Sequence, residues 1–350
     1  MILNYFGTRV YVDTKNNIAF ENMIGKKYCP VIKTDDDNLG KEKAKFSITI
    51  NISEEILFAM EDLFRRIIIH GGSKKEYYLT GLEKMEGCTR KVYVDSCKVY
   101  ILSNMKNNEV VLQGCDVAHL FKIFDLVIVE IFYRSREIEN NAFHFHASAI
   151  ADINHKGTIF IGNKNAGKTT FLCESVFRRK FNYVCNDNCF VEYEKDGKFK
   201  LVPWFEDIKI KLRTMENYNI NMECTRGCEI SPDKEKVFLP LSKGVSNLGL
   251  NYVGVAQLKR IIILNYCVGE SKIERGWNST RFQEIYDNVK IPHDLEHYEF
   301  LGLFNEFNND RFDQLNALID NISKSIEVLK ISYSITSMES IFNQLFDSIQ

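Results

Sequence analysis

The sequence has little net charge to offer a polyanionic partner. It contains 45 Lys and Arg residues against 47 Asp and Glu residues in 350 positions, which leaves a net charge of −2. Proteins that bind nucleic acid or an anionic membrane surface ordinarily carry a basic patch or stripe. The composition therefore indicates neither a nucleic-acid partner nor a membrane partner.

Long apolar runs are also lacking. The first residues show no charged segment followed by a long apolar stretch, and Glu130 interrupts the apolar run 126–132. Such a pattern is typical of a soluble, cytoplasmic protein. The ten cysteines are then expected to be free thiols, because disulfides are rare in a reducing compartment.

Clear zinc motifs are missing as well. Three pairs of residues that can ligate zinc stand four positions apart: Cys185 and Cys189, Cys224 and Cys228, and His293 and His297. Structural zinc sites usually use cysteine pairs with two intervening residues, and the histidine pair has no third ligand in view. Ordinary strand thiols and a solvated helix start are the simpler interpretation, and zinc ligation is the alternative.

One motif carries recognisable chemistry. Residues 162–169 read G-N-K-N-A-G-K-T and match the phosphate-loop pattern G-x-x-x-x-G-K-S/T at every fixed position. An apolar run at 158–161 precedes them and a helix-like stretch at 170–177 follows, which is the strand–loop–helix context that the motif requires. A chance glycine-rich turn before a helix is the alternative.

Each residue type in this loop has its own role in holding phosphates. The two glycines allow sharp turns that point backbone N–H groups at the β-phosphate, the lysine supplies an ammonium group, and the threonine hydroxyl is a ligand for Mg²⁺. The expected nucleotide-binding residues are Gly162, Asn163, Lys164, Asn165, Ala166, Gly167, Lys168, Thr169 and Thr170.

An acidic residue is expected beside this loop. The apolar strand 182–185 ends in Asn186 and Asp187, nineteen residues after Lys168. A carboxylate at the end of a strand that runs parallel to the loop strand is the usual partner of Mg²⁺ in such sites. Asp187 is therefore the candidate acid, together with Thr169 as a candidate metal ligand. A simple Asn-Asp turn is the alternative.

Hydrophobic periodicity predicts alternating helices and strands along the whole chain. A helix is expected at 54–69 and a longer one at about 117–137, and the stretch 215–255 reads as an irregular excursion of the kind that covers an active site. The other expected strands are 9–12, 46–51, 91–102, 110–112, 143–150, 198–202, 208–212, 237–239, 260–264 and 328–333, and the other expected helices are 279–288, 310–325 and 337–349.

The order of these features over residues 116–350 resembles the catalytic domain of the HPr serine kinase/phosphorylase family. In that family a strand bearing a His and a small residue precedes the phosphate loop, and an Asp-Asp pair ends the next strand. Here His146-Ala147 stands sixteen residues before Gly162, and Asn186-Asp187 takes the place of the acidic pair.

The resemblance implies an α/β fold: a P-loop kinase domain of the HPr kinase/PEP carboxykinase-like type with a mixed, β-rich sheet at 116–350, preceded by a smaller α+β domain of unknown role at 1–115. It also implies catalytic roles for Asp187, Lys168 and His146, with His144 as the alternative histidine. Two positions depart from the family pattern: Asn186 replaces one acid and Asn165 stands where glycine is usual. A divergent kinase-like relative is therefore expected rather than a true HPr enzyme.

The expected function is ATP-dependent phosphoryl transfer to a hydroxyl group of a peptide, a protein or a small molecule, with ATP and Mg²⁺ as cofactors. A GTPase is disfavoured because no N-K-x-D segment follows the loop, and an ABC-type ATPase because its signature is missing. A nucleotide-binding module without catalysis is the alternative that Asn186 suggests. The acceptor stays open, and a homo-oligomer is compatible with the sequence.

Overall fold

The computed structural model describes residues 1–28, 33–35, 44–60, 63, 65–70, 79–231, 235–268, 271–290, 300–304 and 311–346. The chain divides into two compact units. Unit 1 contains Met1–Glu139 and the described residues 300–304, and unit 2 contains Asn140–Lys290 and the described residues 311–346. Both units combine helices with a large mixed β-sheet, so the fold is mixed α/β.

Unit 1 is built on a nine-stranded sheet with the order β3-β1-β2-β4-β9-β8-β7-β6-β5. Strand β4 runs parallel to both β2 and β9, and the other neighbours are antiparallel. The strands are β1 (Ile2–Tyr5), β2 (Thr8–Asp13), β3 (Lys33–Asp35), β4 (Phe46–Ile52), β5 (Arg65–His70), β6 (Leu79–Glu86), β7 (Thr89–Val94), β8 (Val99–Asn104) and β9 (Glu109–Gly114).

The described residues of this unit include the helices α1 (Ile18–Tyr28) and α2 (Val117–Glu139). They pack through Phe20, whose ring lies 5.4 Å from the ring of Phe121 and 5.3 Å from that of Phe124. The predicted helix 117–137 is confirmed. Its place differs from the expected domain boundary between residues 115 and 116, because α2 belongs to the N-terminal unit and the division falls after Glu139.

The carboxylate of Glu130 ties a later part of the chain into unit 1. It accepts hydrogen bonds from the backbone N–H groups of Phe300 and Leu301, both at 3.0 Å. Glu130 is only 5% exposed, so these backbone donors find their partner inside the unit rather than in water. A division of the sequence into two consecutive domains cannot predict that residues 300–304 belong to the N-terminal unit.

Two local predictions in unit 1 are wrong. Residues 65–70 form strand β5 and pair with β6, where a helix over 54–69 was expected. The apolar spacing suited a helix, but the consecutive β-branched residues at 67–69 favour a strand, and pairing with β6 satisfies their backbone groups. The expected strand 91–102 is instead the hairpin β7–β8, which turns at residues 95–98.

Unit 2 is built on a second mixed sheet, of ten strands, with the order β13-β11-β12-β19-β15-β14-β10-β21; in addition, β22 pairs with β19 and β20 pairs with β22. Strand β19 runs parallel to β12 and to β22. The strands are β10 (Ala142–Phe145), β11 (Ser148–Ala151), β12 (Lys156–Ile161), β13 (Asn182–Cys185), β14 (Cys189–Tyr193), β15 (Phe199–Pro203), β19 (Ala256–Tyr266), β20 (Lys272–Arg275), β21 (Val289–Lys290) and β22 (Glu327–Tyr333).

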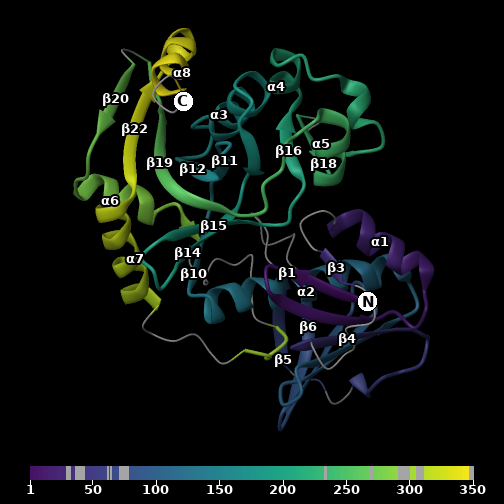
Figure 1. The fold of residues 1–350 in the computed structure, drawn as a ribbon. Coiled ribbons are helices and arrows are strands. Elements are labelled where there is room, and N and C mark those ends of the chain that lie inside the picture. The colour runs from purple at the N-terminus through teal and green to yellow at the C-terminus, as the bar shows by residue number, and fades with distance from the viewer. Residues whose placement is uncertain are drawn as a thin grey trace. The chain divides into compact units, whose positions relative to one another are not determined.

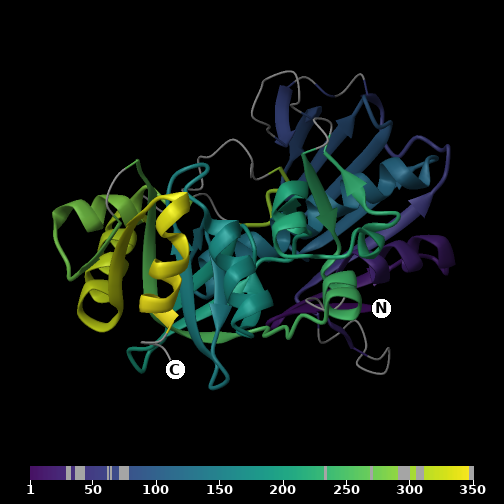
Figure 2. The same ribbon diagram turned by 90° about the horizontal axis from the view of Figure 1, so that it is seen from above.

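Helices cover both faces of this sheet (Figure 1, Figure 2). Successive side chains of β12 point to opposite faces of the sheet. Ile159 and Ile161 are buried together with residues of α6 and α7 on one face, and Phe160 contacts Phe171 of α3 on the other face. Phe171 in turn contacts Phe342 of α8. The helical segments are α3 (Lys168–Cys173), which continues as a π-helical turn (Glu174–Arg178), α6 (Ser279–Tyr286), α7 (Arg311–Ser325), a 3₁₀ turn (Ile335–Ser337) and α8 (Met338–Phe346).

A small three-stranded sheet stands apart from the main one within unit 2, with the order β16-β18-β17. It partly corrects the expectation that 215–255 is irregular, because about half of that stretch lies in short regular elements. The elements of residues 208–248 are β16 (Ile208–Lys211), α4 (Leu212–Asn217), a 3₁₀ turn (Met222–Thr225), β17 (Glu229–Ile230), β18 (Lys236–Leu239) and α5 (Leu241–Leu248). Each is too short to give a clear periodic signal in the sequence.

Across the parts of the chain that the structure describes, none of the helices has both the length and the apolar character needed to cross a membrane.

Candidate functional site

The loop 162–169 connects β12 to α3, as its sequence predicts. Gly162 and Gly167 both have positive φ angles, +144° and +92°. A Cβ atom on Gly162 would lie 2.5 Å from the carbonyl oxygen of Leu264, so this position has no room for a side chain. Asn165 also has a positive φ, of 67°, a conformation that asparagine tolerates better than most residues. The replacement of the usual glycine by Asn165 therefore leaves the backbone path intact.

Lys168 turns back over the loop that precedes it. Its Nζ donates to the carbonyl oxygens of Gly162 at 2.7 Å and Asn163 at 3.4 Å. The side chain is buried, with 8% of the residue exposed. Burial lowers the pKa of Lys168, and the negative charge of Asp187 opposes this effect.

Two residues that the sequence analysis missed hold the loop in place. Asn288 accepts a hydrogen bond from the N–H of Gly162 at 3.1 Å through Oδ1, and its own backbone oxygen accepts from the N–H of His146 at 2.8 Å. Tyr333, at the end of β22, donates its hydroxyl to the carbonyl oxygen of Ala166 at 2.9 Å. Neither residue belongs to a local motif, because each reaches the loop only through the folded sheet.

Asp187 and His146 meet beside the loop. The Nδ1 atom of His146 lies 3.4 Å from Oδ1 of Asp187, and both side chains are partly exposed. His146 does not lie within a strand, as was expected, but in the break between β10 and β11. Strand β10 pairs with β14, whereas β11 pairs with β12, so the chain changes its position in the sheet at this break. The N–H of Ala147 donates to the backbone oxygen of Asp187 at 3.0 Å.

The sheet order explains why the loop and Asp187 come together. Strand β13, which ends just before Asn186, is antiparallel to β11, and β11 is antiparallel to β12. Strands β12 and β13 therefore point in the same direction with one strand between them, and their carboxyl ends lie at the same sheet edge. This agrees with the expected parallel direction, although the two strands are not neighbours.

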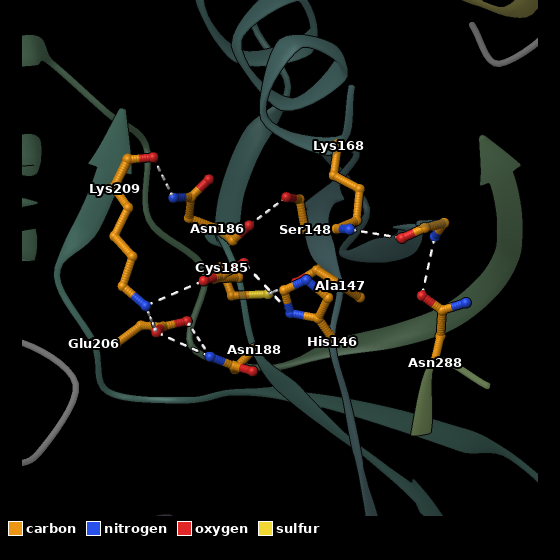
Figure 3. Close-up of polar contacts among 12 residues, drawn as sticks. His146, Ala147, Ser148, Lys168, Cys185, Asn186, Asn188, Glu206, Lys209 and Asn288 are labelled. Carbon is orange, nitrogen blue, oxygen red and sulfur yellow. Dashed lines mark hydrogen bonds and ion pairs between the residues drawn. The ribbon is translucent and has the colours of Figure 1, made fainter. Parts of the chain in front are cut away.

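A partly buried network of Lys209, Glu206 and Asn188 (Figure 3) contacts Asp187 through Lys209. Nζ of Lys209 lies 3.1 Å from Oδ2 of Asp187 and 2.9 Å from Oε2 of Glu206. The amide of Asn188 donates to both carboxylate oxygens of Glu206 at 3.0 Å. Glu206 and Lys209 were not predicted from the sequence. An acid and a base three positions apart are the signal that the sequence contains, and such pairs are common on protein surfaces.

The pKa values in this network move in directions that its burial explains. Burial raises the pKa of Glu206 above its usual value, and the nearby ammonium of Lys209 only partly opposes this. For Lys209, burial acts to lower the pKa, but the carboxylates of Glu206 and Asp187 outweigh burial and raise it. Lys209 is therefore a permanent cation between two acids.

Asn186 occupies the position of the missing second acid. Its Nδ2 donates to the backbone oxygen of Lys209 at 2.9 Å, and its backbone oxygen accepts from the hydroxyl of Ser148. The residue is 2% exposed, and Oδ1 has no hydrogen-bond partner among the described residues. An oxygen acceptor is thus available beside Asp187 without a second negative charge.

These residues surround one cavity of about 640 Å³ in unit 2. All nine of the expected nucleotide-binding residues line it, together with His146, Asn186 and Asp187. The charged residues of the lining are five lysines and two aspartates: Lys164, Lys168, Lys209, Lys211, Lys236, Asp187 and Asp287. The lining of this cavity therefore carries an excess of positive charge, although the chain as a whole has a net charge of −2.

The alternative candidates from the sequence lie elsewhere. His144 is buried in β10, where its ring stacks on Phe190 at 5.1 Å, and it is not among the residues that line the cavity. All nine described cysteines are free thiols. Among the described residues, no group of three or more His, Cys, Asp and Glu side chains gathers as a metal site. His293 and His297 lie outside the described residues.

Comparison with known proteins gives little to set beside this geometry. No family model matches the sequence, and no curated protein matches it either. Among solved structures, the HPr(Ser) kinase/phosphatase from Coxiella burnetii is similar, with 15% identity, coverage of 59% of this chain and 94% of that chain, and a TM-score of 0.27. A likeness with a TM-score this low says nothing about function, which is therefore inferred from the site itself.

Proposed function

We propose that this chain is an ATP-dependent kinase that transfers the γ-phosphoryl group to a hydroxyl group of its acceptor. One observation carries the proposal: a loop of phosphate-binding sequence and the pair Asp187–His146 line the same cavity. Phosphoryl transfer needs a phosphate cradle, neutralising charge and a group that accepts the hydroxyl proton. The three requirements are met by residues within this one cavity.

The loop would bind the nucleotide phosphates through the ammonium of Lys168 and through backbone N–H groups other than those of Gly162 and Ala166, which donate to Asn288 and Asn163. In the structure that ammonium donates to two carbonyl oxygens of its own loop. Phosphate oxygens are stronger acceptors for a cation than neutral carbonyls are. We therefore expect Lys168 to exchange these contacts for the β- and γ-phosphates when ATP binds.

The residues present suit Mg²⁺. Thr169 and Asp187, whose side chains carry oxygen atoms, line one cavity, and Mg²⁺ prefers oxygen ligands. Mg²⁺ would neutralise charge on the β- and γ-phosphates. Thr169 and Asp187 are the proposed direct ligands.

Asp187 is the proposed proton acceptor. As the acceptor oxygen bonds to the γ-phosphorus, the bond from that phosphorus to the β–γ bridging oxygen breaks, ADP leaves with the electron pair, and the hydroxyl proton passes to Asp187. Lys209 holds Oδ2 of Asp187, while Oδ1 faces His146. These two contacts fix the orientation of the carboxylate beside the phosphate loop.

A nucleotide-binding module without catalysis is the second candidate. It is favoured by Asn186, which leaves a single carboxylate at the strand end, and by the ion pair that engages Asp187 with Lys209. Such a protein would bind Mg-ATP at the same loop and transfer nothing.

The test combines nucleotide binding with a transfer assay. Calorimetric titration with Mg-ATP measures binding, and γ-labelled ATP with a panel of serine peptides, sugars and polyols measures transfer. Lys168→Ala should weaken binding, whereas Asp187→Asn should keep binding within about tenfold and reduce transfer by about 10²–10⁴-fold, the usual contribution of a general base.

Asp287→Asn is the matched control, since it makes the same change at the other aspartate of the cavity lining. Asp287 accepts a hydrogen bond from Gln283 within its own helical region, so transfer should change little. If Mg-ATP binds but no acceptor is labelled, the module without catalysis is the better description. If Mg-ATP does not bind to the wild-type protein, both proposals fail.

A further inference from the structure

The antiparallel strands β16 and β18 of the small sheet, called the lysine strands below, carry three lysines that line the cavity. In β16, Ile208 and Ile210 are buried on one side, and alternation places Lys209 and Lys211 on the other. In β18, Lys236 pairs directly with Lys211 across the two strands. All three lysines line the cavity.

These lysines differ in how their charge is balanced. Lys209 lies between the carboxylates of Asp187 and Glu206. No carboxylate within 4.0 Å of Lys211 or Lys236 is found among the described residues. Directly opposed residues on paired strands have Cβ atoms about 4.5–5.5 Å apart, and like charges in such pairs destabilise the sheet. The pair Lys211–Lys236 is therefore a site where a bound anion would relieve repulsion.

The lysine strands and the phosphate loop flank the end of β13. Figure 3 shows Lys168 and Lys209 on opposite sides of the strand end that carries Asn186, and Lys211 follows Lys209 on the same face. In an in-line transfer the acceptor oxygen and the leaving oxygen stand on opposite sides of the phosphorus. With ATP bound to the loop, an acceptor in the cavity would therefore contact the lysine strands.

From this placement we propose that the acceptor is a phosphorylated small-molecule alcohol, whose existing phosphate lies between Lys211 and Lys236. The inference rests on the proposed kinase function and adds the class of its substrate. Two uncompensated positive charges match the charge of about −1.5 to −2 on a phosphomonoester at neutral pH. A carboxylate, with a single charge, would leave one lysine unbalanced. Bound in this way, the phosphate presents the hydroxyl of the same molecule to Asp187.

The test first separates this phosphate site from the loop. The protein is saturated with Mg²⁺ and a non-hydrolysable ATP analogue, and inorganic phosphate is then titrated by calorimetry. Wild-type protein should bind phosphate, and Lys211→Gln and Lys236→Gln should each weaken that binding about tenfold or more. Lys259→Gln is the matched control, because Lys259 is an exposed lysine of unit 2 outside the cavity lining.

The second part compares acceptors in matched pairs. Glycerol 3-phosphate is compared with glycerol, and ribose 5-phosphate with ribose, in the γ-labelled ATP assay. The phosphorylated member should be labelled at least tenfold more efficiently, and this preference should disappear in the double variant Lys211→Gln/Lys236→Gln while ATP binding persists.

Several results would overturn the inference while leaving the kinase proposal intact. These are equal labelling of neutral and phosphorylated alcohols, a preference for serine peptides, tighter binding of malonate than of phosphate, or phosphate binding that the double variant does not change. If the ATP analogue itself fails to bind, the kinase proposal fails. In that case inorganic phosphate is titrated into Lys168→Ala protein. Phosphate binding that is lost when Lys211 or Lys236 is also replaced by Gln supports the phosphate site, and an absence of phosphate binding refutes it.

Discussion

Gly167→Ala is expected to damage the loop through a specific collision. Gly167 has φ of +92°, and a Cβ atom at this position would lie 1.8 Å from Oη of Tyr333. The tyrosine is 4% exposed, and its hydroxyl donates to Ala166. The alanine side chain can therefore enter only if the tyrosine ring moves and its hydrogen bond is lost.

The magnitude can be built from three contributions. Left-handed backbone costs alanine about 1–2 kcal/mol, loss of the tyrosine hydrogen bond costs about 0.5–1.5 kcal/mol, and displacement of a well-packed ring costs about 1–3 kcal/mol. Together these lower the free energy of unfolding by about 3–6 kcal/mol. Nucleotide binding should be lost as well, because the moved ring no longer anchors Ala166.

Gly276→Ala is the matched control. Gly276 has nearly the same φ, +97°, but no atom lies within 4 Å of the added Cβ. It should show the backbone contribution alone, about 1–2 kcal/mol. The difference between the two variants then isolates the collision with Tyr333.

Denaturant unfolding followed by tryptophan fluorescence measures these changes selectively. Both tryptophans of the chain, Trp204 and Trp277, belong to unit 2, so the signal reports the unit that carries the loop. In a double-mutant cycle, Tyr333→Phe should recover about 1–3 kcal/mol of the loss caused by Gly167→Ala. If Gly167→Ala costs no more than Gly276→Ala, or if Tyr333→Phe recovers nothing, the described packing of the loop is wrong.

Three further predictions concern groups away from the loop. Burial raises the pKa of Glu206 above 4.5, so the folded chain binds its proton more tightly than the unfolded chain, and the free energy of unfolding should fall as the pH rises from 4.5 through the folded pKa. Glu206→Gln should flatten this slope in unfolding curves recorded across that range. Glu130→Ala should speed hydrogen exchange at the amides of Phe300 and Leu301 by about 10- to 100-fold, because it removes their acceptor, whereas amides of β9 should keep their rates. Burial raises the pKa of Cys173 to about 12, so mass-spectrometric mapping should find it unalkylated in native protein at pH values where the exposed cysteines of unit 1 react.

The phosphate loop illustrates what local sequence predicts well. A β-branched strand, two glycines at fixed spacing and a following helix are all encoded within about twenty residues, and each reflects a short-range physical rule. The expected elements around β19, α7 and β22 were also found, because long periodic segments give a strong signal. The helix predicted at 54–69 failed at a place where pairing with β6, many residues away, decides the structure.

His146 shows where local reasoning reaches its limit. Its sequence suggests one continuous strand from 143 to 150, yet the chain changes position in the sheet at His146 and Ala147. That change is favoured by backbone hydrogen bonds to Asn288 and Asp187, which come from distant segments. No pattern within the strand itself reports such partners.

By itself, the sequence determined the path of the loop and its chemistry, because glycines at positive φ, a lysine and a threonine act through their immediate neighbours. Only the tertiary structure decided which residues stand around the loop. Tyr333 reaches the loop, and Asn288 and the lysines of β16 and β18 reach the cavity, through sheet order and strand register. These depend on pairing between segments that are far apart in the chain.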